Sequence, residues 1–170
     1  FNNQRAVIFT LLIGLVRLFV KVHVLMRLLR KRAHKRAIAI ADATETAAAR
    51  LLSYTVNKQV FGEFQPISLK EMINLNIERG VYDPEFLNYY TDEEIAKLDS
   101  YICHPRDEHF TYAGMRQVVD KYLCQDRSTN QLFETPQFMY MMIAATLFAQ
   151  YPKETRIQYV RRYYNATSLF

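Results

Sequence analysis

The sequence predicts a mainly α-helical fold, made of several helices and one short β-hairpin. The first observation behind this prediction is that apolar residues recur at helical spacing in successive segments. The second is a pair of capping boxes, in which a hydroxyl residue is followed three positions later by Glu. The third is a polar loop between two short strand-like pieces, which is typical of a hairpin. A chain of 170 residues suits one domain, or one domain and part of another.

The first half of the chain contains the helix signals that are easiest to assign. A helix is expected from Asp42 to the residue before Gly62, which serves as its C-terminal stop. Pro66 opens a linker. Ser68 and Glu71 then predict the start of a helix that ends at Gly80, and Thr91 and Glu94 predict the start of another. The inward residues are expected to be Ala48, Leu51, Leu52, Thr55 and Val56 in the first helix, and Ile95, Leu98 and Ile102 in the last.

The second half predicts a hairpin between helices. Strand-like pieces at 122–124 and 131–133 flank the loop 126–130. Thr135 and Pro136 then begin a helix as N-cap and first residue, because Pro lacks only a donor that is unused there. The expected buried faces are Phe110, Tyr112, Met115, Val118, Val119 and Tyr122 before the hairpin, then Phe138, Met141, Met142, Ala145 and Phe148 after it. In a last helix beyond Pro152, we expect Ile157, Val160 and Tyr164 on one side and Arg156, Arg161 and Arg162 on the other.

The net charge of +5 is distributed unevenly. Residues 1–40 contain nine Lys and Arg and no Asp or Glu, whereas residues 41–170 contain 13 basic and 17 acidic residues. The first segment could be a basic amphipathic helix that binds an anionic membrane or RNA. Its apolar run at 6–16 is too short to cross a bilayer, which needs about 20 residues. Basic residues also follow this run where a signal peptide would have small ones. The first residue is Phe1 rather than Met, which favours a piece of a longer protein.

Few residues suggest chemistry. His104, Asp107, Glu108 and His109 lie close together in sequence, but their spacing fits no recognised zinc pattern. We interpret them as a polar loop in which Asp107 or Glu108 caps the next helix. Cys103 and Cys124 are too few for a disulfide framework and are expected to be small core residues. With four Gly in the chain, there is little room for a phosphate-binding loop.

Several idiosyncratic stretches carry a resemblance to a known family. They are ARLL at 49–52, FGEFQP at 61–66, RGVYDPEFLNYYTDEEI at 79–95, HPRDEHFTYAGMRQ at 104–117 and the long segment from KYLCQDRSTN at 121 to YVRRYYNATS at 168. From about Ala47 to Phe170, without gaps, the chain resembles the N-terminal helical region of the large (alpha) subunit of class I ribonucleotide reductase. The resemblance divides the chain into three parts: an atypical basic segment at 1–40, the last helix of an ATP-cone-like region at 41–65, and the N-terminal helical domain at 66–170.

The resemblance implies a role in reducing ribonucleoside diphosphates to deoxyribonucleotides for DNA synthesis. In the family, a metal-containing small subunit generates the radical, a redox-active cysteine pair in the large subunit is re-reduced by thioredoxin or glutaredoxin, and ATP and dATP are allosteric effectors. The large subunit forms a homodimer in the cytoplasm. Its catalytic cysteines lie in an α/β barrel, and Cys103 and Cys124 match none of them. We therefore expect this segment to join the ATP cone to the barrel, to hold no cofactor, to bind no nucleic acid and to be inactive alone.

One residue of an allosteric site is carried over from the resemblance. Lys58 lies where the family has a lysine that reaches the phosphates of the ATP in the cone, a task that suits a compact ammonium group. The alternative is a solvated lysine that the helix dipole favours near a C-terminus. The other family residues of this site, a lysine, a stretch with Arg and Gly and a threonine, are absent or replaced here.

The basic segment at 1–40 has a further interpretation, as an out-of-frame remnant of the ATP cone. In the family, this place holds a helix of the pattern D-I-H-E-T-I-I-K-A-A-A. The codons for residues 23–34, read one base earlier, permit a closely similar sequence in the register of the downstream resemblance. The alternative function is a non-catalytic helical adaptor that binds membrane or nucleic acid through this basic helix.

Overall fold

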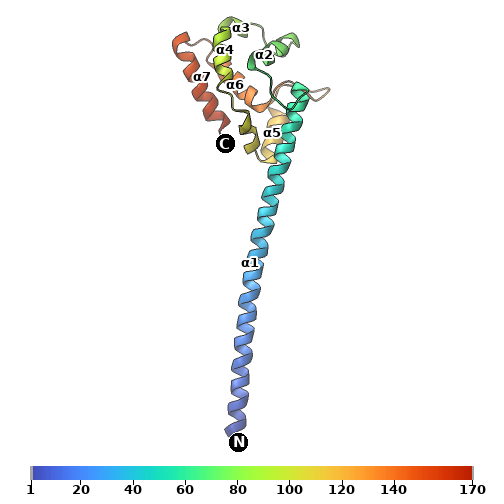
Figure 1. Ribbon diagram of the computed structural model, residues 1–170, viewed down its shortest axis with the longest axis vertical. Coiled ribbons are helices and arrows are strands. Elements are labelled where there is room, and N and C mark those ends of the chain that lie inside the picture. Colours follow the sequence, from blue (N-terminus) through green and yellow to red (C-terminus); the bar gives the residue numbers. More distant parts are fainter. Residues whose placement is uncertain (1, 170) are drawn as a thin grey trace. The chain divides into compact units, whose positions relative to one another are not determined.

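A computed structural model describes the backbone of residues 2–169 and the side chains of residues 21, 22 and 24–169. Figure 1 shows a mainly helical chain, as predicted, with a single hairpin in the described part. The elements are α1 (Asn2–Phe61), α2 (Leu69–Glu78), α3 (Phe86–Tyr89), α4 (Asp92–Asp99), the 3-10 helix η1 (His104–His109), α5 (Tyr112–Lys121), β1 (Gln125–Asp126), β2 (Gln131–Leu132), α6 (Pro136–Leu147) and α7 (Lys153–Ser168).

The chain divides into two compact units, Phe1–Thr44 and Glu45–Phe170, and the division falls within α1. The helix that was expected to begin at Asp42 begins far earlier in the structure, at Asn2. Every described side chain from 21 to 47 is exposed, including Val22, Leu25 and Met26. Among the helices that the structure describes, none combines the length and apolarity that a bilayer crossing requires.

The end of α1 belongs to the second unit, and its predicted face is partly correct: Val56 is buried, and Ala48 and Leu52 are half-buried. Ala49, Ser53, Val56 and Val60 are buried, whereas Leu51 is 67% exposed and Thr55 is also exposed. The buried residues recur every three or four positions, so the prediction placed the face slightly too far round the helix. Gly62 ends α1 as predicted. Its φ of +78° is a conformation that suits glycine, and its amide donates to the Lys58 carbonyl at 2.9 Å.

Both predicted capping boxes are present. The Ser68 hydroxyl accepts from the Glu71 amide at the start of α2, and the Thr91 hydroxyl accepts from the Glu94 amide at the start of α4. In each case the Glu side chain returns a bond to the N-cap amide. α4 buries Ile95 and Leu98 as expected, while Ile102 lies beyond its end and is half-buried.

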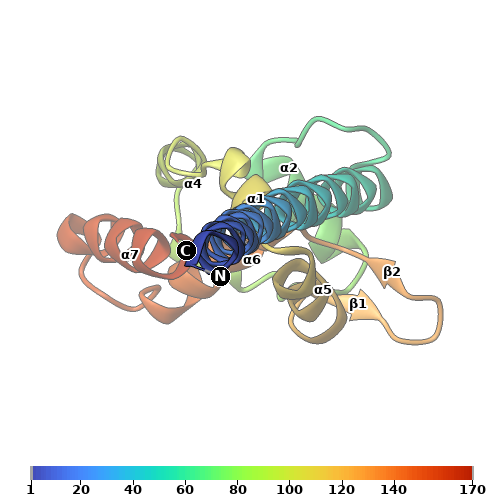
Figure 2. The same cartoon turned by 90° about the horizontal axis from the view of Figure 1, so that it is seen from below.

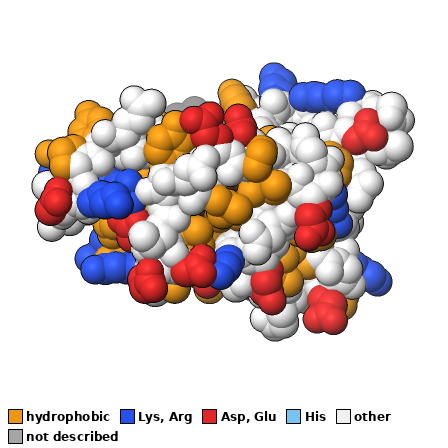
Figure 3. Space-filling view, turned by 90° about the horizontal axis from the view of Figure 1, so that it is seen from above, with side chains coloured by type: hydrophobic (Ala, Val, Ile, Leu, Met, Phe, Trp, Pro, Cys, Tyr) orange, Lys and Arg blue, Asp and Glu red, His pale blue; other side chains and the backbone are white. Residues whose placement is uncertain are grey.

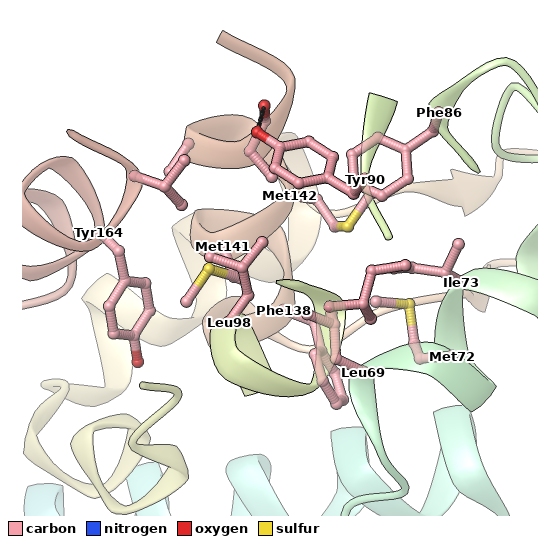
Figure 4. Close-up of a cluster of buried hydrophobic side chains, with 14 of the residues drawn as sticks. Leu69, Met72, Ile73, Phe86, Tyr90, Leu98, Phe138, Met141, Met142 and Tyr164 are labelled. Carbon is pink, nitrogen blue, oxygen red and sulfur yellow. Dashed lines mark hydrogen bonds between the residues drawn. The ribbon is translucent and has the colours of Figure 1, made fainter. Parts of the chain in front are cut away.

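α6 is the central helix of the second unit. Eight of its twelve residues are buried, so it is covered on most sides rather than along one stripe. Phe138, Met141, Met142 and Ala145 are buried as predicted, and Phe148 is half-buried just after the helix ends. Figure 4 shows how Phe138 and Met141 lie between residues of α2, α4 and α7. Met139, on another side of α6, joins a second cluster with Val56 and Met115.

The hairpin is present, with its first strand later than predicted (Figure 2). β1 is Gln125–Asp126 rather than 122–124, because α5 continues to Lys121 and Tyr122 forms its C-cap. Gln125 pairs with Leu132, and Asp126 pairs with Gln131 in antiparallel register. Tyr112 and Tyr122 were expected in the buried face of α5 but are exposed at 44% and 60%.

Candidate functional site

Lys58 lies in the last turn of α1, and its side chain is exposed. Its ammonium group is 5.6 Å from the centre of the Phe64 ring, in the loop that follows the helix. This geometry permits a cation–π contact, which is weak at an exposed position. Tyr54 meets the same Phe64 ring edge-on. No ion pair involving Lys58 occurs among the described residues, so its charge can face an anion without giving up a carboxylate partner.

The surroundings of Lys58 are fixed by contacts to the rest of the second unit. Asn57 donates to the Phe64 carbonyl at 3.4 Å, and Gln59 donates to the carbonyl of Asn130 at 2.8 Å. Asn130 is the hairpin residue with a positive φ of 58°. The end of α1 is thereby connected to the hairpin loop. The structure positions Lys58 on the surface of this unit, in the last turn of α1 and beside Phe64.

The sequence from His104 to His109 forms η1, and its polar residues take part in a buried network. Asp107 is 4% exposed and accepts a bond from the Gln137 side chain at 2.8 Å. The Gln137 carbonyl oxygen in turn accepts from the Tyr164 hydroxyl at 2.6 Å, and that hydroxyl accepts from the Cys103 amide at 2.8 Å. Burial raises the pKa of Asp107 to about 7, against a smaller lowering by the bonds to Gln137.

The prediction that Asp107 or Glu108 caps the next helix is wrong, because Asp107 belongs to this buried network instead. Neither Asp107 nor Glu108 caps α5, whose N-cap is Thr111, with its hydroxyl accepting from the Gly114 amide at 3.1 Å. Glu108 instead faces Arg50 at 3.7 Å. Among the described residues there is no group of His, Cys, Asp and Glu that could hold a metal ion. η1 is therefore a structural element whose Asp107 is connected by hydrogen bonds to α6 and, through Gln137, to α7.

A buried ion pair connects α4 to α7. Arg156 was predicted on the polar side of its helix, but it is 3% exposed and pairs with Glu94 through two of its guanidinium nitrogens, one of them at 3.0 Å. The guanidinium carbon is also 4.5 Å from the centre of the Tyr90 ring. Desolvation raises the pKa of Glu94, but the bonds from Arg156 and from the Thr91 amide outweigh it and lower the pKa overall.

A second buried carboxylate holds the hairpin in place. Glu134 is 3% exposed and accepts from the Tyr82 hydroxyl and, at 2.9 Å, from the Cys124 amide. It lines a cavity of about 870 Å³ together with residues of α3, α6 and the segment 81–85. Sequence inspection did not single out Glu134, Tyr82 or Gln137. The available signal was a polar residue inside an apolar stretch, such as Gln137 directly before Phe138.

The two cysteines are free thiols and are not the core residues that were predicted. Cys103 is half-buried and Cys124 is exposed. The sulfur of Cys124 is nevertheless partly desolvated and lies near Glu134, and both effects raise its pKa to about 12. A thiol with such a pKa remains protonated near neutrality and is a poor nucleophile.

The fold and these sites define an all-α structural domain whose buried polar residues connect its helices. A protein-family model described as "Ribonucleotide reductase, all-alpha domain" matches residues 108–170. Over the matched residues, the chain belongs to the large (alpha) subunit family of class I ribonucleotide reductase, an oxidoreductase family of deoxyribonucleotide synthesis.

Individual relatives extend the similarity beyond the family match. The chain is 44% identical over 123 residues to ribonucleoside-diphosphate reductase 1 subunit alpha of Escherichia coli. The aligned residues cover 72% of this chain and 16% of that protein. It is 43% identical over 121 residues to the alpha subunit of Enterobacteria phage T4, with coverage of 71% and 16%. It is 30% identical over 146 residues to the alpha subunit of Treponema pallidum, with coverage of 84% and 17%. The chain thus spans about one sixth of the length of these curated relatives.

Proposed function

We propose that this chain is the N-terminal portion of a ribonucleoside-diphosphate reductase alpha subunit, that it joins the ATP cone to the catalytic barrel, and that it is inactive alone. The observation that carries this proposal is the 44% identity over 123 residues to an alpha subunit more than six times as long as the match. In such a subunit the domain has a structural role, because its polar residues connect helices instead of meeting in one reactive cluster. Its two cysteines lie in this helical domain as free thiols.

A complementation experiment tests the joining role. The part of the E. coli alpha subunit that this chain does not cover is produced separately and combined with this chain, the small radical-generating subunit, thioredoxin or glutaredoxin, and a ribonucleoside diphosphate. We expect this chain alone to form no deoxyribonucleotide, and the combination to form more than the barrel portion without it. Equal product with and without this chain would contradict the joining role. Product from this chain with the small subunit alone would contradict its inactivity.

The partners in that assay are part of the proposal. We propose that this chain, within its whole subunit, takes part in a homodimer in the cytoplasm and acts with a small subunit that carries the metal and radical. The segment itself is proposed to hold no cofactor and to bind no nucleic acid. Size-exclusion chromatography of the reconstituted subunit, with and without the small subunit, measures both assemblies. A reconstituted subunit that stays monomeric and leaves the small subunit unbound would contradict them.

Lys58 is the proposed contact to the phosphates of an allosteric ATP. Its exposure, its position at the end of α1 and its lack of a carboxylate partner among the described residues support this role. The test uses a chimera in which residues 1–40 are replaced by the corresponding segment of the E. coli relative. We expect the chimera to bind ATP, and Lys58→Ala to weaken that binding by about tenfold, which is typical of losing one charge-assisted contact. Lys97→Ala, an exposed lysine of α4, is the control. Unchanged affinity in Lys58→Ala would remove the lysine from the site.

Residues 1–40 are proposed to be an out-of-frame remnant of the cone. Their composition, with nine basic and no acidic residues, and the complete exposure of the described side chains in this segment support the idea. Sequencing the encoding DNA is decisive. An adjacent frame that is open and encodes the cone pattern supports the proposal, and stop codons in that frame refute it.

The second candidate function is a helical adaptor that uses the basic part of α1. Seven Lys and Arg lie between 21 and 36, all exposed and interspersed with exposed apolar side chains such as Leu25 and Met26. Binding to anionic vesicles or to RNA that falls steeply with added salt would favour the adaptor. Complementation of reductase activity in the assay above would favour the reductase.

A further inference from the structure

The cavity beside Glu134 has a lining whose charge and shape indicate a ligand. It has a volume of about 870 Å³ and is formed by the segment 81–85, α3, residues around the hairpin, α6 and the segment 149–151. Its walls are mostly apolar, from side chains such as Met142, Ile143 and Leu147. Pockets of this size and character commonly bind small molecules or apolar groups. Figure 3 looks onto the face where α3 lies and shows hydrophobic side chains between Asp and Glu side chains, with Lys and Arg also present on this face.

The charge of this lining is negative and lacks a counter-charge. Asp83, Glu85 and Glu134 line the cavity, and among the side chains that the structure describes no Lys or Arg does. Glu134 is the most buried of the three, and both of its described hydrogen bonds come from neutral donors, the Tyr82 hydroxyl and the Cys124 amide. A carboxylate in an apolar setting is stabilised strongly by a nearby cation, because the local dielectric constant is low. The cavity therefore favours a positively charged guest.

Aromatic rings make the same cavity suitable for an organic cation. Tyr82, Tyr89, Tyr122 and Tyr151 all contribute to its lining. In the described part of the chain, the cation–π contacts made by Lys and Arg use other rings: Phe64, Phe133, Tyr164, Tyr90 and Tyr101. Several aromatic rings around a carboxylate form a common recognition site for guanidinium and ammonium groups. Tyr122 is 60% exposed and Tyr151 46%, so their rings are accessible to an incoming group.

We propose that this cavity binds an organic cation, a guanidinium or ammonium group carried on an apolar body. The charged head would lie toward Glu134 and the tyrosine rings, and the apolar body would lie against the face of α6 that carries Ile143 and Leu147. The cation could be a free small molecule or a basic side chain on a polypeptide. This inference does not depend on the proposed reductase role, because the whole lining belongs to residues of this chain.

The test compares two ligands that differ in charge but hardly in shape, n-pentylguanidine and the neutral n-pentylurea. Binding is measured on the full chain by ¹H–¹⁵N NMR titration. We expect pentylguanidine to bind saturably and to shift the amide signals of 81–83, Glu85 and 122–124, and pentylurea to bind at least about tenfold more weakly. Equal affinity for the two ligands, or shifts confined to other parts of the chain, would overturn the proposal.

Three variants locate the site. Glu134→Gln keeps an acceptor for Tyr82 and removes the charge, and we expect it to lower the affinity for pentylguanidine at least about tenfold. Tyr122→Leu alters an exposed ring without touching the core, so it should keep the fold and weaken binding about threefold. Glu63→Gln removes a charge outside the lining and should have no effect. If Glu134→Gln does not fold, Tyr122→Leu decides, and unchanged affinity in that variant refutes the assignment.

A second ligand, a short peptide, distinguishes the two sources of the cation. Acetyl-Leu-Arg-Leu-amide presents the same guanidinium on a polypeptide with apolar neighbours. Tighter binding of the peptide than of pentylguanidine, with the same loss in Glu134→Gln, assigns the cavity to a basic side chain of a partner segment. Tighter binding of pentylguanidine assigns it to a free small cation. Failure of both ligands to bind overturns the proposal, whatever the outcome of the reductase assay.

Discussion

Removing the buried guanidinium of Arg156 should destabilise the second unit by about 3 kcal/mol. Replacement by Met keeps much of the apolar stem but leaves Glu94 without its cationic partner. Breaking a buried ion pair from one side costs about 3–5 kcal/mol. Arg156 has 3% of its side chain exposed and Glu94 has 18%. Because water can partly solvate the stranded Glu94, the lower end of that range applies.

Urea denaturation followed by near-ultraviolet circular dichroism measures the free energy of unfolding of the second unit. All twelve tyrosines lie between 54 and 164, so their signal reports on the unit Glu45–Phe170 and not on the exposed part of α1. The matched control is Arg162→Met, which removes an exposed arginine of the same helix and should change the free energy of unfolding by less than about 0.5 kcal/mol.

The double variant Arg156→Met with Glu94→Gln separates the pair from the packing. The glutamine removes the stranded charge and can still accept from the Thr91 amide, which Glu94 bonds at 3.0 Å. We expect the double variant to recover at least half of the lost stability, because a buried pair replaced on both sides is often nearly neutral. A loss below about 1 kcal/mol in Arg156→Met would refute the reasoning, since that value is typical of an exposed pair.

Three further predictions concern the other buried polar groups. Burial raises the pKa of Asp107 to about 7, well above the usual range of a carboxyl group, so the protonated form favours the folded state. The contribution of this group to stability should therefore be highest below about pH 4 and be lost as pH rises through 7. Asp107→Asn should flatten that dependence when urea midpoints are measured from about pH 4 to 8. Thr135→Val should leave thermal stability unchanged or raised, because the Thr135 hydroxyl is buried without a partner, whereas Thr91→Val should lose about 1 kcal/mol with its capping box. Tyr164→Phe should lower the free energy of unfolding in urea by about 2 kcal/mol, because it leaves the Cys103 amide and the Gln137 side-chain carbonyl without their hydrogen-bond partner. A loss below about 0.5 kcal/mol, which is typical of a surface substitution, would contradict this prediction.

The elements that local chemistry determines were predicted well from the sequence. Capping boxes at Ser68 and Thr91, the glycine stop at Gly62 and the Thr135–Pro136 helix start each depend on a few adjacent residues, and each is confirmed. Thr135 shows where local reasoning ends. It occupies the N-cap position as predicted and is fully buried, but its side chain makes no capping bond.

The directions of helix faces were predicted less well, since they depend on what lies opposite. Leu51 and Tyr122 are apolar at helical spacing and still face outward. Arg156 was assigned to the polar face from its charge alone, yet it is buried because Glu94 lies opposite on α4. Asp107 likewise accepts a hydrogen bond from Gln137, 30 positions away, instead of capping the helix that follows it. No local rule identifies such partners, because they are separated by tens of residues in sequence.

Several of these long-range polar partners lie in the stretches that carry the resemblance to the reductase family. Glu94 belongs to the stretch 79–95, while Arg156 and Glu134 belong to the long segment after 121; Tyr82 and Asp107 belong to stretches that bond to that segment. An apolar core position accepts several side chains of similar volume, so it constrains the sequence loosely. A buried polar residue needs a donor or acceptor at one place, and losing it leaves the partner unsatisfied. The polar contacts therefore constrain residue type and spacing more tightly than the apolar pattern does, and the apolar pattern alone indicates only a helical fold.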